Sequence, residues 1–397
     1  MPTPHQDPIV IVGAARTPMG AFQGDFSDLA AHDLGGAAIK AAVARAGVAP
    51  EKVDEVLFGN CLMAGQGQAP ARQAGFKGGL PRSTGAVTLS KMCGAGMEAT
   101  ILAHDQLVAG SRDVMVSGGM ESMTNAPYLL KKGRGGYRMG HDKIFDHMML
   151  DGLEDAYEPG RSMGTFGEDC AAKYGFTRAE QDAFATASVE RAKAATASGA
   201  FAAEITPVTV KSRAGETVVS VDEGPGKVKL DKIASLKPAF KKDGTITAAS
   251  SSSINDGAAA LVMMRASTAT KLGCKPLARI VGHATHAQEP EWFATAPLGA
   301  TQKALAKAGW AVGDVDLWEI NEAFAVVPMA LMKELNLPHD KVNVNGGACA
   351  LGHPIGASGA RIMVTLIYAL QARGLKKGLA TLCIGGGEAT AVAVELV

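Results

Sequence analysis

Residues 86–100 read AVTLSKMCGAGMEAT, a pattern that predicts a β-strand turning directly into a helix. Residues 86–89 are typical of a short buried strand, and the small residues with Leu and Ile at 95–108 favour a helix ending at Gly110. Cys93 lies at the junction, where unpaired N–H groups and the positive end of the helix dipole favour an ionised thiolate. One interpretation of this position is an activated nucleophile, and the other is an ordinary small buried cysteine.

The glycines after Cys93 also fit the relaxed Gly-x-Gly-x-x-Ala fingerprint of dinucleotide-binding folds. That fingerprint needs an acidic residue about 20 positions further on, at the end of the next strand, to bind a ribose hydroxyl. The next predicted strand, 114–117, is followed by Gly-Gly-Met instead. An NAD-dependent oxidoreductase is therefore a weak alternative.

Length and composition predict a reduced, intracellular α/β protein. The 397 residues suggest two or three domains. Lys plus Arg and Asp plus Glu both total 39, so the charge points neither to nucleic acid nor to an acidic membrane. The six cysteines form no Cys-x-x-Cys pair. Residues 1–8 lack the pattern of a leader, and no apolar run looks long enough to cross a bilayer, so we expect a cytoplasmic protein without membrane association.

Two pairs of similar segments predict two halves with one topology. Residues 46–59 resemble residues 308–321, each being a helix end followed by a short strand. Residues 114–121, VMVSGGME, resemble residues 381–388, TLCIGGGE. Because both pairs occur in the same order along the chain, an internal repeat is the simplest explanation.

The chain between the halves, residues 122–253, is richer in charge and glycine and is predicted to be an insertion that covers the active site. It contains a helical run at 178–198 and a basic loop, KKGRGGYR, at 131–138. The default interpretation of this loop is a solvated surface, with an oligomer contact or a polyanion site as alternatives. Serines at 250–253 precede an Ala-rich strand at 258–264, and they could form a turn or hydrogen-bond an amide-bearing ligand.

Three further polar candidates lie at the ends of predicted strands in the C-terminal half. Asn321 ends one strand, His353 lies in a glycine-rich turn after a strand at 342–345, and Cys383 ends a third. Parallel α/β sheets bind ligands at the carboxyl ends of strands, so we expect these residues and Cys93 to share one site. Each alone has a structural explanation, because Asn commonly forms turns. The other eight histidines show no metal-ligand spacing, and no metal is expected.

These residues in their flanking sequence resemble the thiolase family. The resemblance rests on NEAF at 321–324, NGG at 345–347, GHPIGASG at 352–359, CIGGG at 383–387, ARTP at 15–18 and GGMESM at 118–123. These stretches extend over essentially the whole chain. The resemblance implies an α/β protein with a five-layered α-β-α-β-α fold, made of two topologically similar halves with an inserted loop domain.

The resemblance also divides the chain into three parts. Residues 1–122 and 255–276 would form the N-terminal half, and residues 277–397 the C-terminal half. Residues 123–254 would form the loop domain, with roles in tetramerisation and in binding CoA. The basic loop with Met139 resembles the tetramerisation loop of short-chain members, which implies a homotetramer built as a dimer of dimers.

For each candidate the resemblance implies a role. Cys93 would take an acyl group from an acyl-CoA with His353 as its base, and Cys383 would remove a proton from the α-carbon of a second acetyl-CoA. His353 and a water held by Asn321 would form one oxyanion hole, and the backbone N–H groups of Cys93 and Gly385 the other. The residues expected around substrate and CoA are Ser252, Leu153, Met163, Ala248, Phe293, Ala323 and Phe324.

The implied activity is the reversible condensation of two acetyl-CoA to acetoacetyl-CoA and free CoA by a ping-pong route, with no cofactor. A broader 3-ketoacyl-CoA thiolase, working in the cleavage direction as in β-oxidation, is the alternative within the family. A ketosynthase fits less well, because such enzymes lack a second catalytic cysteine. A non-catalytic CoA- or lipid-binding scaffold is the alternative from another class.

A few positions depart from the common family pattern. They are Ser90, Ser162, Phe293 and Glu388. None is a predicted catalytic residue. Phe293 stands beside the expected acyl pocket, so these departures leave the acyl chain length open.

Overall fold

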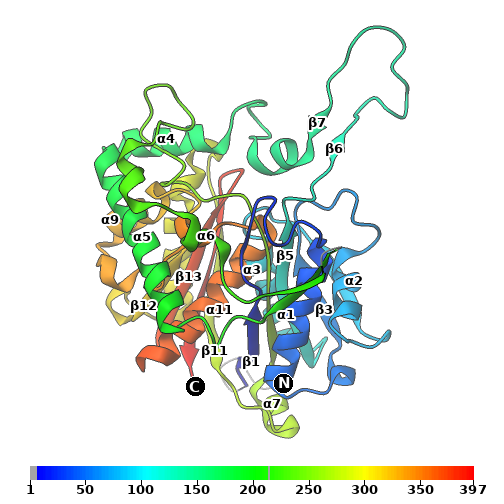
Figure 1. The fold of residues 1–397 in the computed structure, drawn as a ribbon. Helices are drawn as coiled ribbons and strands as arrows, with labels where there is room; N and C mark the ends of the chain where they lie inside the picture. The colour runs from blue at the N-terminus through cyan, green and yellow to red at the C-terminus, as the bar shows by residue number, and fades with distance from the viewer. Residues whose placement is uncertain (1–6, 213–214) are drawn as a thin grey trace.

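A computed structural model describes residues 7–212 and 215–397, and a sheet of ten strands lies at its centre (Figure 1). Residues 1–6, where the sequence shows no leader pattern, lie outside the described residues. The strands are β1 (Ile9–Arg16), β2 (Gly20–Ala21), β3 (Glu55–Gly59), β4 (Gly85–Leu89), β5 (Val114–Ser122), β10 (Asn255–Arg265), β11 (Ala278–Ala287), β12 (Leu317–Ile320), β13 (Lys377–Ile384) and β14 (Glu388–Leu396).

The sheet consists of two halves with the same strand order, except that β4 has no counterpart among the described strands of the C-terminal half. One half runs β4-β3-β5-β10-β1 and the other β12-β13-β14-β11, while the short β2 pairs with β10. The halves meet where β1 and β11 pair over two residues, Val10 with Arg279 and Ile11 with Ala278. The similar segments 114–121 and 381–388 fall in β5 and β13, which hold equivalent places. The predicted pair of similar halves is confirmed.

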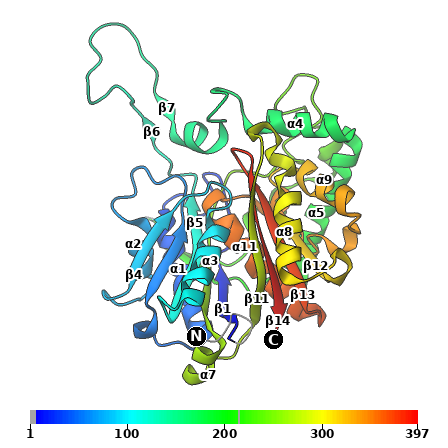
Figure 2. The ribbon, with the colours of Figure 1, turned by 180° about the vertical axis from the view of Figure 1, so that it is seen from behind.

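Helices cover both outer faces of the sheet and fill the space between its halves (Figures 1 and 2). Helices α1 (Ala31–Ala46) and α2 (Pro70–Lys77) pack on the N-terminal half-sheet, and α8 (Ala296–Ala308) and α9 (Val326–Leu335) pack on the C-terminal one. Helices α3 (Ala95–Ala109) and α11 (Ile355–Arg373) share the central cluster of buried apolar side chains. The layers are thus α-β-α-β-α, as predicted.

The two central helices approach each other through glycines near their N-terminal ends. A Cβ atom built on Gly359 would lie 2.5 Å from the backbone nitrogen of Met97. One built on Gly96 would lie 2.9 Å from the carbonyl oxygen of Gly356. Any larger residue would force the helices apart, so glycine allows the close backbone contact. The contact places the first turns of α3 and α11 side by side.

Helix α11 corrects the expectation that no apolar run would be long enough to cross a bilayer. Its 19 residues are long and apolar enough to do so by length and composition. In the structure, however, 83% of this apolar window is buried. The helix packs against α3, β5, β10 and β13, so burial in the central layer accounts for its composition.

A less regular region lies between β5 and β10. Its elements are β6 (Tyr128–Leu129), β7 (Phe145–Asp146), α4 (Met163–Tyr174), α5 (Arg178–Ser198), β8 (Val208–Ser212), β9 (Gly215–Val219) and α6 (Glu223–Lys227). The predicted helix at 178–198 matches α5 at both ends. The loop that joins β6 to β7 projects away from the rest of the molecule (Figure 1). Two further short helices are α7 (Ala266–Leu272) and α10 (Ala348–Leu351).

Two predicted strands differ from the structure. Residues 86–89 lie in β4, which is a half-exposed edge strand with Val87 44% exposed, and not a buried one. Residues 342–345 are not a strand, because Val342 makes a single bridge to Trp318 and Asn343 has a φ of +48°. Asn tolerates this left-handed conformation. Its amide accepts from the N–H and donates to the carbonyl of Ile320, both at 2.8 Å, and so replaces the ladder hydrogen bonds.

A buried ion-pair network joins β1 to the insertion. Arg16 donates from Nε to Glu204 at 2.6 Å and from its two terminal nitrogens to Asp222 at 2.6 and 2.8 Å. All three side chains are fully enclosed. Arg16 therefore balances two carboxylates that have no access to water.

Replacing Arg16 by Met should strongly destabilise the fold. The change leaves two buried carboxylates without their cation, and breaking a buried pair in this way typically costs about 3–5 kcal/mol of unfolding free energy. Urea denaturation followed by tryptophan fluorescence measures the loss. As a control, Arg279→Met removes an exposed pair with Glu395 and should cost no more than about 1 kcal/mol. Equal denaturation midpoints for the two variants would contradict the prediction.

Candidate active site

Three of the four predicted catalytic residues line one small cavity between the two half-sheets. Cys93, His353 and Cys383 surround a space of about 60 Å³. The other lining residues are Met92, Gly152, Leu153, Met163, Ser252, Phe293, Ala323, Phe324, Ile355 and Gly385. Both halves and the insertion contribute, so the cavity exists only when all three parts are folded together.

Cys93 lies on a sharp turn between β4 and α3. The preceding residue, Met92, has a φ of +46°, a left-handed conformation that side chains other than glycine rarely adopt. The turn is closed by a hydrogen bond of 3.0 Å from the Gly94 N–H to the Lys91 carbonyl. A strained backbone conformation such as that of Met92 persists only where the surrounding structure holds it, and such conformations are concentrated at functional sites. The turn fixes the sulfur at the edge of the cavity.

The Cys93 sulfur is a thiol in the free protein, which corrects the expectation of a resting thiolate. Burial raises the pKa of Cys93 to about 11. The backbone N–H groups of Gly385 and of Cys93 itself point at the sulfur and lower the pKa, but by less than burial raises it. The sequence shows that a helix begins beside the sulfur, but it does not show the loss of water around it, which has the larger effect on the pKa. Nucleophilic attack therefore needs a base.

His353 is placed to be that base. Its Nδ1 lies 2.6 Å from the Ser358 hydroxyl, which in turn donates to the Pro354 carbonyl at 2.9 Å. Because Ser358 donates its hydroxyl proton to Pro354, its oxygen can only accept a hydrogen bond from Nδ1 of His353. Nδ1 therefore carries the proton of the neutral imidazole, and Nε2 is unprotonated. Among the described residues, Nε2 is buried and has no hydrogen-bond partner. Burial, helped by the charge of Arg361, lowers the pKa of His353 to about 3, so the imidazole is neutral and can accept a proton.

Cys93 and His353 occupy equivalent places in the two halves. Each lies two residues before a central helix, Cys93 before α3 and His353 before α11. The glycine contact between these helices brings their first turns together. The repeat in the fold thus brings a thiol and an imidazole from two distant parts of the chain to one cavity.

A buried carboxylate holds the segment that follows His353. Glu121 accepts hydrogen bonds from the N–H of Gly356 and the N–H of Cys61, both at 2.9 Å, and from the Asn60 amide at 2.6 Å. Burial raises the pKa of Glu121 to about 7, although these backbone donors oppose the shift. Glu121 thereby ties the first turn of α11 to the segment after β3.

Cys383 and Asn321 come from neighbouring parallel strands. Cys383, in β13, is 1% exposed, and burial together with the nearby Cys93 holds its pKa well above the usual value for a thiol. Asn321 follows β12, where its N–H donates to the Thr381 carbonyl at 3.0 Å. Its side-chain amide is buried without a partner among the described residues, and it is not one of the cavity-lining residues. A buried amide of this kind is suited to holding a water molecule.

Six of the seven residues predicted to contact substrate or CoA line the cavity, and one does not. Ala248 is exposed and lies outside the lining set. The Ser252 hydroxyl donates to the Ala323 carbonyl at 3.1 Å. Met92, Gly152 and Ile355 also line the cavity but were not predicted. Gly152 lies in a π-helical segment, Met149–Leu153, a form that is common at functional sites and that no sequence pattern revealed.

Family models match almost the whole chain. The thiolase N-terminal domain matches residues 9–267, and the thiolase C-terminal domain matches residues 274–396. The chain belongs to the thiolase family.

Individual thiolases are similar over their full length. An acetyl-CoA acetyltransferase of Chromobacterium violaceum is 51% identical over 98% of this chain and 99% of its own. The crystal structure of the Bacillus anthracis acetyl-CoA acetyltransferase has a TM-score of 0.96 at 42% identity, covering 98% and 99% of the two chains. The acetyl-CoA acetyltransferase structure from Syntrophomonas wolfei has a TM-score of 0.95 at 43% identity, covering 98% and 100%.

One departure from the thiolase pattern, Glu388, forms an ion pair across the mouth of the cavity. Its carboxylate is paired with the ammonium group of Lys91. A more open pocket of about 490 Å³ at this mouth includes both residues and shares Met92, Gly152, Met163 and Gly385 with the inner cavity. The pair joins the turn that carries Cys93 to the glycine loop that carries Gly385. These are the two loops whose N–H groups point at the Cys93 sulfur.

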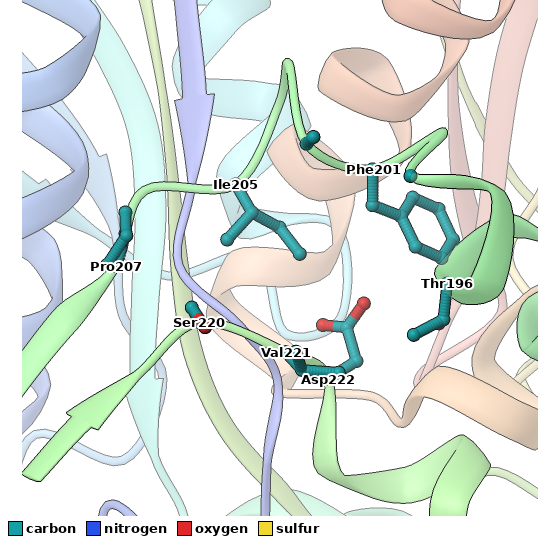
Figure 3. Close-up of a pocket in the computed structure, with 9 residues that line it drawn as sticks. Thr196, Phe201, Ile205, Pro207, Ser220, Val221 and Asp222 are labelled. Carbon is teal, nitrogen blue, oxygen red and sulfur yellow. The ribbon is translucent and has the colours of Figure 1, made fainter.

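A separate pocket of about 310 Å³ lies elsewhere in this thiolase and contains none of the candidate residues. Figure 3 shows Thr196, Phe201, Ile205 and Pro207 facing Ser220, Val221 and Asp222 across it. The carboxylate of Asp222 already pairs with Arg16. The other lining residues are mostly apolar. Because Asp222 is paired, the pocket offers no free charged group for catalysis.

Proposed function

We propose that this thiolase is an acetyl-CoA C-acetyltransferase, which condenses two acetyl-CoA to acetoacetyl-CoA and free CoA and also runs in reverse. The observation that carries the proposal is the meeting of two sulfurs and one neutral imidazole around one small cavity. Relatives named acetyl-CoA acetyltransferase, about half identical along the whole chain, support it. These side chains supply a nucleophile and two proton acceptors, so the chemistry needs no cofactor.

In the first half-reaction Cys93 becomes acylated. Its sulfur attacks the thioester carbonyl of acetyl-CoA while its proton passes to Nε2 of His353. The CoA sulfur leaves and takes that proton, so free CoA departs and acetyl-Cys93 remains. The N–H groups of Cys93 and Gly385 stabilise the oxyanion of the tetrahedral intermediate. A sulfur suits this step because it is both a good nucleophile and a good leaving group.

In the second half-reaction the new carbon–carbon bond forms. The Cys383 sulfur, acting as a thiolate, removes a proton from the methyl carbon of a second acetyl-CoA. The enolate attacks acetyl-Cys93, and the proton returns to the Cys93 sulfur as that bond breaks. Cys383 is a thiol at rest, so its proton first passes to Nε2 of His353, which is free again once CoA has left, and it returns to Cys383 when the cycle closes. The N–H that Nε2 of His353 then carries, together with a water on Asn321, stabilises the enolate oxygen.

The size of the cavity favours an acetyl group over longer chains. A space of about 60 Å³ holds only a few water-sized groups. Phe293 closes one side of it, and its ring packs edge-on against Phe166 and Phe324 at centroid distances of 6.2 and 6.4 Å. A longer acyl chain would have to displace this aromatic cluster. The departure at Phe293 therefore supports the short-chain function.

Thiolysis of 3-ketoacyl-CoAs of increasing length tests the function directly. We expect kcat/KM to be highest for acetoacetyl-CoA and to fall by at least about tenfold for a chain with four more methylenes, because Phe293 leaves no room. Phe293→Ala should recover activity on the longer substrate. Phe201→Ala, at a buried phenylalanine outside the cavity, should leave the ratio of the two kcat/KM values unchanged. A higher kcat/KM for the longer chain would instead support the broad 3-ketoacyl-CoA thiolase.

We also propose that the enzyme is a cytoplasmic homotetramer that uses the projecting loop between β6 and β7 as a contact. This loop exposes large apolar side chains, among them Leu130, Met139 and Ile144. Met139 is 98% exposed, and a group of exposed apolar side chains on one loop favours a surface that a partner covers. Light scattering should give a tetramer for the wild type and a smaller species for Met139→Asp. A monomeric wild type would overturn this part of the proposal.

A further inference from the structure

Three side chains that can bind metals converge on the surface between α3 and β11. His104 and Asp105 lie on α3, and His283 lies on β11. Nε2 of His283 is 3.1 Å from Nδ1 of His104 and 3.0 Å from Oδ1 of Asp105. Nδ1 of His104 is 3.0 Å from the same carboxylate oxygen. The three atoms form a nearly equilateral triangle.

Hydrogen bonds alone do not satisfy this triangle well. If both facing ring nitrogens carry protons, two N–H groups oppose each other at 3.1 Å. If only one carries a proton, that proton must serve both the other nitrogen and the carboxylate. If neither does, three lone pairs face one another. A cation bound by all three atoms would turn each of these contacts into a favourable one.

The size of the triangle matches the ligand spacing around a small divalent metal ion. Zinc lies about 2.0–2.2 Å from histidine nitrogens and carboxylate oxygens. An ion at that distance from three atoms about 3 Å apart has ligand–metal–ligand angles of roughly 90–95°. Such angles correspond to one face of an octahedron or to a distorted tetrahedron. Two histidines and one carboxylate on one face are a known ligand set for first-row transition metals.

The surroundings leave one side of the triangle open. The Asp105 side chain is 57% exposed, whereas those of His104 and His283 are 18% and 15% exposed. Water could therefore complete the coordination from the side of Asp105. The charged groups whose fields reach the cluster are Lys307, near His283, and Glu98, near Asp105. Their opposite signs largely offset each other.

We propose that His104, Asp105 and His283 form a binding site for a divalent transition-metal ion, with Zn²⁺ as the probe. The site is separate from the catalytic cavity, whose lining residues do not include any of the three. It links α3, which begins just after Cys93, to β11 of the other half. A bound ion would act as a clamp between the halves and stabilise the folded protein. The inference does not depend on the proposed function.

Zinc titration of the chelator-treated full-length protein tests the site. Isothermal titration should give one equivalent of Zn²⁺ per chain, and saturation should raise the melting temperature. His283→Gln should weaken Zn²⁺ binding by at least about tenfold, since the loss of even a supporting residue has that effect. His286→Gln, on the same strand but bonded to Gln288 and Lys303, should bind like the wild type. Asp105→Asn, on an exposed position, should repeat the loss if His283→Gln folds poorly.

Cobalt distinguishes this site from the catalytic sulfurs. Co²⁺ bound by nitrogen and oxygen lacks the intense thiolate charge-transfer band that Cys93 or Cys383 would give. We expect the wild type and His286→Gln to show a spectrum of bound cobalt without that band, and His283→Gln to show no spectrum of bound cobalt. A thiolate band at one equivalent, equal Zn²⁺ affinity in the wild type and His283→Gln, or no binding at all would each overturn the proposal. The three residues would then be a hydrogen-bonded cluster only.

Discussion

Replacement of Cys93 by Ser is expected to abolish the acyl-enzyme and to lower kcat by a factor of about 10⁴ or more, as in other enzymes that lose their nucleophile. The geometry of the turn should survive, because serine is nearly isosteric and keeps the N–H groups in place. A hydroxyl is far less acidic than a thiol, however, and a neutral buried imidazole cannot take its proton easily. The residual rate would come from substrate binding and the oxyanion donors.

Intact mass spectrometry after mixing with acetyl-CoA measures this effect. The wild type should gain the mass of one acetyl group, and Cys93→Ser should gain none. Cys274→Ser provides the matched control, because Cys274 is another buried thiol that lies outside the cavity. That variant should be acetylated and active like the wild type. A wild type that forms no adduct would favour the alternative of a non-catalytic CoA- or lipid-binding scaffold.

Replacement of Cys383 by Ser should separate the two half-reactions. Acylation of Cys93 needs only His353 as its base, so the variant should still release one equivalent of CoA in a burst. Condensation needs a base for the second acetyl-CoA, and loss of such a base typically costs about 10²–10⁴ in rate. Steady-state turnover should therefore fall by that factor while the burst remains.

Rapid-quench measurement of CoA release with acetyl-CoA alone distinguishes the outcomes. A variant that keeps the burst and loses turnover supports Cys383 as the base for the α-carbon. A variant that loses both equally would show that Cys383 also takes part in acylation. Unchanged turnover would remove Cys383 from the mechanism. Cys170→Ser, at a buried thiol outside the cavity, controls for the general effect of the substitution.

Local sequence patterns predicted much of this fold because most of the decisive features are local. The turn from strand to helix around Cys93, the helix α5 and the similar segments in β5 and β13 all follow from short patterns of small, apolar and glycine residues. The prediction of a strand at residues 342–345 was wrong because the side chain of Asn343 makes the hydrogen bonds that a neighbouring strand would make through its backbone. A tertiary hydrogen bond of that kind leaves no signal in the local pattern.

Features of the site that depend on burial or on distant contacts could not be predicted. The raised pKa of Cys93 comes from the walls of the cavity, which three separate parts of the chain supply. The ion pair of Lys91 with Glu388 and the cluster of His104, Asp105 and His283 join residues that are far apart in sequence. Spacing rules for metal ligands apply within short segments, so they overlooked the two histidines.

The glycine contact between α3 and α11 has a consequence for how this enzyme could diversify. At the ends that carry the sulfur and the imidazole, the two helices contact each other main chain against main chain, through Gly96 and Gly359. Phe293 and Met163, which shape the space for the acyl group, belong instead to peripheral segments. Substitutions in these peripheral segments can therefore change the substrate preference without moving the sulfur or the imidazole. Conversely, a single methyl group added at Gly359 would shift the two helices and lower the rate of reaction with every substrate alike.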